Sequence, residues 1–331
     1  MPRTLLSLTL LALLTLLVSC DRPVSPANAP SAPRAIELEA MRFVTLSPAL
    51  GLMLQDLGIE DRVVGAHDWD HALGRSIPRV GSLDGIDYEA LLLANPTHVL
   101  IELSADAALP ARLVSLSRQH GWVVRRVGSL DTLDDVGETM DDLYLSYVSP
   151  PEAGATSTIG FSDPAARFDK TMPSEAFARA ISDRGPSVRG AGRLPLLGAL
   201  GPPQAIGPGS FHHQVLTRLG GQNAIDSGGM WQELDTEDVV RLKPDAIVLV
   251  LPRDVTDDDR FVEPPEASDA ELIRRLGIVG TQDIPAITTR RVALIDHPLA
   301  HVPAGSSMRA FADELGSILE RWTAEGRASA P

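Results

Sequence analysis

Aromatic and imidazole side chains in predicted loops are the residues of this chain best suited to binding chemistry. Trp69 and Trp231 are two of only 4 Trp, and each follows a predicted strand region in a different half of the chain. Flat indole rings bury a large area at little cost in side-chain entropy, so they suit a large planar ligand. The alternative is that both rings pack beneath their loops.

Six histidines also fall in predicted loops or at predicted helix starts: His67, His71, His212, His213, His297 and His301. An imidazole can ligate a metal ion or haem iron, or contact a polar group of a ligand. An exposed loop histidine without such a role is the commoner case, and no four-ligand metal set can be assigned. Four arginines could pair with an anionic siderophore or with haem propionates, although a solvated surface arginine is the commoner state of each one: Arg75, Arg79, Arg253 and Arg309.

Motifs of the common enzyme classes are absent from the sequence. It has no Gly-x-Ser-x-Gly elbow, no phosphate-binding loop and no dinucleotide fingerprint. The Gly-rich segment 207–210 lacks the lysine and the spacing of a phosphate loop, and the acidic run 257–259 is typical of a solvated loop. We therefore predict a non-catalytic protein with no metal site and no cofactor of its own.

The elements that position these residues are indicated by a stretch that occurs twice. Residues 86–101 and 234–249 align without a gap, which matches three pairs of residues: Asp87 with Asp235, Glu89 with Glu237, and Pro96 with Pro244. In each copy the Asp caps a short helix, the Glu lies in its first turn, and the Pro ends it before a buried strand. Together with other alternating strands and helices, the repeat predicts two doubly wound α/β lobes with parallel sheets.

Ligands of doubly wound sheets bind at the carboxyl ends of the strands. Ser47 and Pro48 follow the predicted strand at residues 43–46, so they are candidates for a contact with the ligand.

Composition and charge exclude several classes of function. The chain has 331 residues, 44% hydrophobic and 22% charged, which is typical of globular domains. Its formal net charge of -15 disfavours nucleic acid as a partner, because phosphate binding needs a basic face. The single Cys excludes a disulfide framework and a thiolate zinc cluster.

The amino-terminal segment predicts export and lipidation. Arg3 precedes an apolar run from Leu5 to Val18, which has the length of a signal-peptide core. The run ends in Leu17-Val18-Ser19-Cys20, which resembles the bacterial lipobox, so Cys20 is the predicted site of lipid attachment. The residues after Cys20 are mostly Pro, Ala, Ser and Asn, a composition that is typical of a tether.

The order of several short motifs resembles the class III substrate-binding proteins of bacterial ABC importers, which capture cobalamin, ferric siderophores or haem. The resemblance covers nearly all of residues 43–319 except 148–173, and its motifs occur in this order: Leu46-Ser47-Pro48, Leu57-Gly58, Arg62-Val63-Val64-Gly65, Val80-Gly81, the two repeat copies, Gly220-Gly221-Gln222-Asn223 and Arg291-Val292. The cobalamin-binding member of the family is the most similar, especially from Gly201 to Val248.

The resemblance implies roles for particular residues. Glu89 and Glu237 match the pair that docks into arginine pockets on the two permease subunits. Trp69 and Trp231 match cleft aromatics of the cobalamin binder, whereas Leu83 and Gln204 replace two others. The ligand-binding cleft is therefore expected to contain seven residues: Ser47, Pro48, Trp69, Leu83, Gln204, Trp231 and His297.

The resemblance also implies the organisation of the chain. We expect a lipoprotein signal peptide at 1–20, a flexible tether at 21–40, an amino-terminal lobe at 41–130, a connecting helix with an inserted loop at 131–190, and a carboxyl-terminal lobe at 191–325. A single long helix joins the lobes in the family, but residues 148–173 interrupt it here.

The expected function is that of a monomeric lipoprotein, anchored outside the cell membrane, that delivers a metal chelate to an ABC permease dimer with its ATPase subunits. A corrinoid is the first candidate, a ferric siderophore the second and haem the third. An orphan ligand sensor and an enzyme are the alternatives from other classes.

Overall fold

The computed structural model describes residues 40–74, 76–149, 171–184, 192–200, 202–253 and 267–328. The predicted signal peptide with Cys20, the tether and most of the predicted insertion therefore lie outside the described residues, as does Arg75. All described elements from Met41 onward belong to one compact unit. Within this part of the chain, none of the helices combines the length and the apolar character needed to span a bilayer.

The first lobe is built on a six-stranded sheet with the strand order β4-β3-β2-β1-β5-β6. Its strands are β1 (Phe43–Thr45), β2 (Val63–His67), β3 (Arg79–Ser82), β4 (Gly85–Ile86), β5 (His98–Glu102) and β6 (Val123–Val127). Its helices are α2 (Pro48–Asp56), η2 (Glu60–Arg62), α3 (Tyr88–Ala94) and α4 (Ala111–His120). All pairs are parallel except β3 with β4, which a two-residue loop joins.

The second lobe is built on a five-stranded sheet with the order β11-β9-β8-β12-β13. Its strands are β8 (Leu196–Leu200), β9 (Pro203–Ile206), β11 (Trp231–Glu233), β12 (Ile247–Val250) and β13 (Val292–Ile295), and a small separate pair contains β7 (Arg193–Leu194) and β10 (Gln222–Asn223). Its helices are α8 (Phe211–Arg218), α9 (Thr236–Leu242), α10 (Asp269–Arg275), η4 (Val279–Thr281) and α11 (Pro285–Thr288).

This second sheet is mixed, which corrects the expectation of parallel strands. β8 pairs in parallel with β12, and β12 with β13, but β9 is antiparallel to both β8 and β11. Only two residues separate β8 from β9, and a parallel pairing would need a crossover of a dozen or more.

The repeated stretch folds the same way in both lobes. Asp87 accepts hydrogen bonds from the first-turn N–H groups of α3, and Asp235 accepts one from the N–H of Asp238 in α9. Both helices end at a residue with a left-handed backbone, Asn95 or Lys243, each with a φ of 46° and each followed by Pro. The predicted caps and helix ends are confirmed.

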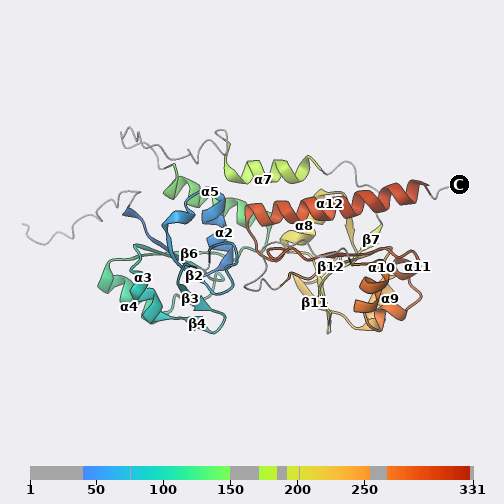
Figure 1. Cartoon of the computed structure of the whole chain (residues 1–331), viewed down its shortest axis with the longest axis horizontal. Helices are drawn as coiled ribbons and strands as arrows, with labels where there is room; N and C mark the ends of the chain where they lie inside the picture. Colours follow the sequence, from blue (N-terminus) through green and yellow to red (C-terminus); the bar gives the residue numbers. More distant parts are fainter. Residues whose placement is uncertain are drawn as a thin grey trace, which may run out of the picture. The chain divides into compact units, whose positions relative to one another are not determined.

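Three further helices connect and cover the lobes: α5 (Leu133–Tyr147), α7 (Pro173–Ser182) and α12 (Gly305–Ala328). Figure 1 shows α7 and α12 side by side. Ser174 does not cap α7. It lies in the first turn, where its N–H donates to Oδ1 of Asp141 in α5 at 2.9 Å. A side chain of α5 thus caps the start of α7.

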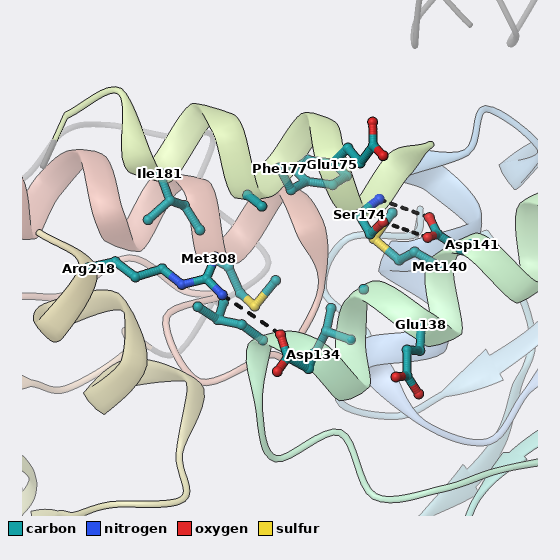
Figure 2. A pocket seen from close by; sticks show the side chains of 14 residues that line it. Asp134, Glu138, Met140, Asp141, Ser174, Glu175, Phe177, Ile181, Arg218 and Met308 are labelled. Carbon is teal, nitrogen blue, oxygen red and sulfur yellow. Dashed lines mark hydrogen bonds and ion pairs between the residues drawn. The ribbon is translucent and has the colours of Figure 1, made fainter. Parts of the chain in front are cut away.

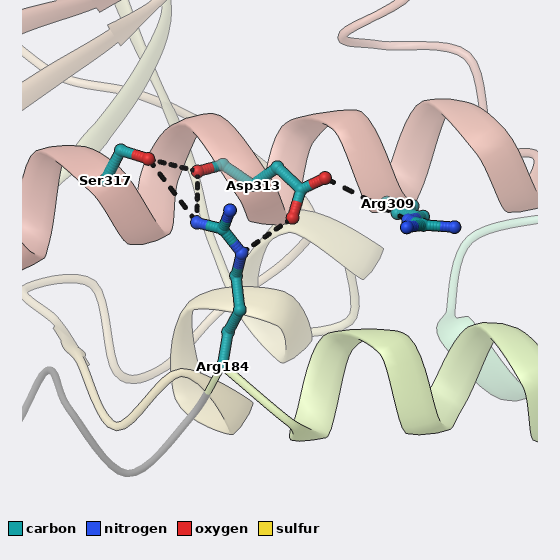
Figure 3. A network of polar contacts seen from close by, with 4 residues as sticks. All are labelled: Arg184, Arg309, Asp313 and Ser317. Atoms are coloured by element: carbon teal, nitrogen blue, oxygen red, sulfur yellow. Dashed lines mark hydrogen bonds and ion pairs between the residues drawn. The ribbon is translucent and has the colours of Figure 1, made fainter.

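The far end of α7 is tied to α12. Arg184, just beyond α7, lies with its Nε 2.7 Å from Oδ1 of Asp313 and donates from NH1 to the Asp313 carbonyl at 2.9 Å. Figure 3 shows this network, in which Arg184 also reaches Ser317 and Arg309 approaches the same carboxylate.

One apolar core runs through both lobes and the helices that join them. Leu50 of α2, Met140 of α5, Phe211 of α8 and Phe311 of α12 all belong to the same buried cluster. Separate apolar clusters fill the outer side of each sheet. The two lobes therefore share a packed interior, and any movement between them must preserve it.

Candidate ligand-binding site

A hollow in the first lobe lies where strands β1, β2 and β5 end. Its volume is about 240 Å³, and it is lined by Leu46, Ser47, Pro48, His67, Trp69, Leu83, Glu102, Leu103 and Ser104. Four of the seven predicted cleft residues are among these, namely Ser47, Pro48, Trp69 and Leu83. Trp69 is 59% exposed and Leu83 78% exposed, so both present apolar surface to a potential ligand.

Two polar residues that line this hollow, Ser47 and Glu102, are hydrogen-bonded to each other, and the sequence analysis did not predict Glu102 as a site residue. The Ser47 hydroxyl donates to Oε2 of Glu102 at 2.6 Å. Burial raises the pKa of Glu102, although the hydrogen bond from Ser47 opposes that shift. The available signal was an acid at the carboxyl end of an apolar strand, because this edge of a parallel sheet is where ligands bind.

His67 ends β2 and has a defined tautomer. The backbone N–H of Trp69 donates to its Nδ1 at 3.1 Å, so Nδ1 carries no proton and Nε2 does. Burial lowers the pKa of His67, which favours the neutral ring. In this arrangement the remaining N–H of His67 is hydrogen-bonded to the backbone of Ser82, whereas a metal ligand would need an unprotonated Nε2.

In the second lobe, Trp231 begins β11 opposite Ile206 of β9 and is 43% exposed. Its ring lies close over Gly198 of β8: an ideal Cβ built there would be 2.3 Å from the ring. His301 meets the same indole edge-on, with ring centroids 5.5 Å apart. Gly198, which has no side chain, leaves room for the Trp231 ring on β8, and the imidazole of His301 packs against it.

Behind Trp231, the imidazole of His212 is buried. Its Nε2 lies 2.8 Å from the carbonyl oxygen of Ala300 and 3.3 Å from Nδ1 of His301. Burial, assisted by His301, lowers the pKa of His212 to about 3. Both rings thus support the Trp231 region as neutral groups. No cluster of three or more His, Cys, Asp or Glu side chains within the described ranges is placed to hold a metal ion.

At the carboxyl ends of β12 and β13, a second histidine repeats the geometry of His67. The N–H of Leu299 donates to Nδ1 of His297 at 3.2 Å, which leaves the proton on Nε2. Nearby, Nε of Arg253 lies 3.2 Å from Oδ2 of Asp296. Burial and Arg253 lower the pKa of His297, so each lobe presents a neutral imidazole at its strand ends.

The remaining candidates are placed less favourably. Gln204 is exposed on β9 opposite Glu233. His213 contacts the side-chain amide of Asn223 at 3.1 Å, and Arg79 donates to the carbonyl of His67 at 3.3 Å, so both stabilise local structure. Arg309 lies on α12 near Asp313, and His71 is exposed.

A larger pocket of about 310 Å³ lies between helices α5, α7, α8 and α12 rather than at the strand ends. Figure 2 shows its apolar wall, which includes Met140, Ile181 and Met308, and the ion pair between Arg218 and Asp134 at its edge. None of the predicted cleft residues lines it.

The predicted docking residues occupy matched positions. Glu89 lies in the first turn of α3 and Glu237 in the first turn of α9, and both are exposed. Neither carboxylate is hydrogen-bonded or ion-paired to another residue of the part of the chain that the structure describes.

Comparisons with known proteins place this geometry in context. No family model matches the chain. Its sequence is 25% identical to the vitamin B12-binding protein of Salmonella typhimurium over 212 residues, 63% of this chain and 72% of that protein.

Two solved structures from Vibrio cholerae have similar folds. The periplasmic vitamin B12-binding protein BtuF gives a TM-score of 0.59 at 17% identity, over 86% of this chain and 98% of its own. The periplasmic haem-binding protein HutB gives 0.62 at 17% identity, over 84% and 98%. The chain thus has the fold of the class III substrate-binding proteins, as its motifs predicted. These similar proteins are described as binding proteins and not as enzymes.

Proposed function

We propose that this chain is the substrate-binding component of an ABC importer for a metal chelate, and that the chelate lies between its two lobes. One observation carries the proposal: each lobe presents an exposed Trp beside an imidazole, in a chain with only 4 Trp. Exposed indole rings are costly unless they meet a partner, and two of them can hold a flat ligand on both sides.

A corrinoid is the first candidate for the chelate. The support is the vitamin B12-binding relative, together with the donor set of the site. In the described arrangement, His67 and His297 each have a protonated Nε2 and accept a backbone N–H at Nδ1. The Nε2–H of His297 can donate to an amide oxygen of a chelate whose metal is already coordinated, whereas neither ring is prepared to ligate haem iron. The chelate is cargo, so the protein needs no resident cofactor.

Isothermal titration of residues 41–331 with four probes tests this assignment: cyanocobalamin, haemin, a ferric hydroxamate siderophore and free Zn²⁺. We expect saturable one-to-one binding of cyanocobalamin, and weaker or no binding of the other three. Tight binding of haemin or the siderophore alone would keep the transport role and replace the corrinoid. Binding of Zn²⁺ alone, or of none of the probes, would contradict the proposed function.

The partners and the location form a second part of the proposal. We infer that Glu89 and Glu237 dock onto a permease dimer driven by ATPase subunits, and that lipid on Cys20 holds the protein at the outer face of the cell membrane. The support is the matched exposure of both acids and the lipobox sequence. Membrane fractionation should recover the wild-type chain with the membrane and Cys20→Ala in the soluble fraction. Equal partitioning of the two would count against the anchor.

A further inference from the structure

A buried acid lies directly after Trp69 in the first half of the proposed site. Asp70 is only 1% exposed, and its backbone N–H donates to the carbonyl of His67 at 3.0 Å. Its Oδ1 accepts the N–H of Leu73 at 3.0 Å. The carboxyl group thus closes the short loop that carries Trp69 out of β2.

The second carboxyl oxygen has no such partner. Oδ2 of Asp70 is buried and makes no hydrogen bond within the described ranges. It lies against α2 at Gly51, where an ideal Cβ would be only 1.7 Å away, so only a glycine leaves room for it. A buried carboxylate oxygen without a donor is costly, while a protonated carboxyl group tolerates the same place better.

The charged and titratable groups around Asp70 do not neutralise it. On β3, Arg79 lowers the pKa of the acid but directs its NH1 to the carbonyl of His67, at 3.3 Å. On the loop itself lie Asp68 and the exposed His71, and the imidazole of His67 lies at the end of β2. Helix α2 contributes no charged side chain before Asp56, which instead accepts the N–H of Ser306.

We propose that Asp70 is a positioning residue whose protonation state controls the loop that carries Trp69. The protonated acid holds this loop in place, and the ionised acid loosens it. The effect on the ligand rests on the proposed function, whereas the effect on Trp69 does not. Burial raises the pKa of Asp70 to about 6, against smaller opposing effects from hydrogen bonds with the backbones of Leu73 and Ala72 and from Arg79. Ionisation therefore takes place in the mildly acidic range, around pH 6.

The direction of the effect follows from the sign of the shift. Because the folded loop prefers the protonated acid, the loop is most stable at pH values below about 3.8, the ordinary pKa of an Asp, and it loses stability as the pH rises from there through about 6. His67 acts in the opposite direction, because protonating its Nδ1 at low pH would break its hydrogen bond with the N–H of Trp69. The effects of Asp70 and His67 on the loop therefore have opposite pH dependences, which distinguishes them in a measurement.

The experiment follows the exposure of Trp69 in the ligand-free chain. Trp231→Phe removes the other exposed indole, since the remaining two, Trp122 and Trp322, are only 7% and 3% exposed. Acrylamide quenching in this background should increase roughly two-fold between pH 5 and pH 7.5, with a midpoint near 6. Adding Asp70→Asn should abolish that transition, whereas adding Asp68→Asn, which changes an exposed acid on the same loop, should leave it in place.

A second variant, Gly51→Ala, tests the role of the Asp70 carboxylate independently, in case Asp70→Asn does not fold. Gly51→Ala places a Cβ where Oδ2 lies, so it should push the carboxylate toward water and move the midpoint down toward that of an ordinary Asp. A flat quenching profile in the Trp231→Phe background, or an unchanged midpoint in both Asp70→Asn and Gly51→Ala, would overturn the proposal.

Ligand titration then connects the loop to the site. Cyanocobalamin should bind the wild-type chain about ten-fold more weakly at pH 8 than at pH 5.5, and Asp70→Asn should reduce that ratio to less than about two-fold. If none of the four probes binds while the quenching transition is intact, the proposed function would be contradicted and the role of Asp70 would stand. A pH ratio that is equal in both chains would overturn the role of Asp70 alone.

Discussion

At the scale of single residues, the sequence identified exposed aromatics more readily than the groups that support them. Ser47 and Pro48 were candidates because strand ends in doubly wound sheets are ligand-binding edges, whereas Leu83, and in part Trp69, came from the family resemblance; all four line one hollow. Glu102 and Asp70 were not predicted, because their roles depend on burial by segments distant in sequence. The pairing of His212 with His301 likewise joins residues 89 positions apart. Periodicity within one segment carries no information about such contacts.

Gly198 provides a test of how Trp231 is held. In Gly198→Ala the new methyl group would lie 2.3 Å from the indole, so the ring must move. We expect cyanocobalamin affinity to fall on the order of ten-fold, because a displaced hot-spot aromatic loses most of its contact. The matched control is Gly229→Ala in the same lobe, whose nearest neighbour would be 3.9 Å away. Equal affinities for the two variants would argue that the position of Trp231 does not matter.

Glu314 predicts a pH dependence of stability. Burial and Asp296 raise its pKa to about 7, although Arg253 opposes the shift. The native state therefore favours the protonated acid. The loss of stability caused by ionised Glu314 is absent at pH values below about 4.5 and complete above about 7. Because the side chain is partly exposed, solvent screening reduces that cost to roughly 1–2 kcal/mol.

Urea unfolding at pH 5 and pH 8 measures this effect. Glu314→Gln should unfold with a higher free energy than the wild type at pH 8, and nearly the same free energy at pH 5. The exposed Glu233→Gln serves as the control and should show no difference at either pH. A Glu314→Gln chain less stable than wild type at pH 8 would show that the ionised acid is stabilising.

At the scale of elements, the repeat was the most reliable guide to the fold. Its helices and strands were predicted because their caps, turn residues and apolar runs are local in sequence. The antiparallel pairs of β9 were not predicted, because pairing direction depends on the short β8–β9 connection rather than on strand composition. The start of α7 likewise depends on a distant segment, since its cap comes from α5 and not from its own sequence.

Asp141 tests the connection between α5 and α7. It accepts the N–H of Ser174 at 2.9 Å and its hydroxyl at 2.5 Å. Asp141→Ala removes this cap, so the free energy of unfolding in urea should fall by about 1–2 kcal/mol. Glu138→Ala on the same helix is the control, because that side chain is exposed. Losses of the same size in both variants would mean that the cap itself contributes nothing.

At the scale of the whole molecule, the joint between the lobes limits their relative movement. The apolar core continues from α2 through α5 to α12, and polar contacts cross the same boundary. Ser306 donates from its backbone to Asp56 at 2.9 Å, and Leu133 donates to the side chain of Gln214 at 2.8 Å. Wide opening would have to break these contacts and expose core surface. We therefore expect a modest closure around the chelate.

Docking can be separated from binding at this scale. Reversing both charges, with Glu89→Lys and Glu237→Lys, should abolish uptake into proteoliposomes that contain the permease, because each exposed acid is expected to meet a basic pocket. Chelate affinity should stay within about two-fold of wild type, since neither acid lines the hollow. Asp84→Lys, an exposed acid of the first lobe, is the control and should support uptake. Normal uptake by the double variant would contradict the docking role.

The most direct test of the account is whether one chelate contacts both lobes. Cyanocobalamin should be titrated into the wild-type chain, Trp69→Ala, Trp231→Ala and the control Ile278→Ala, which removes an apolar side chain that is 70% exposed elsewhere on the second lobe. We predict that each Trp variant loses on the order of ten-fold or more in affinity while the control matches wild type. Unchanged affinity in either Trp variant would contradict a site shared between the lobes.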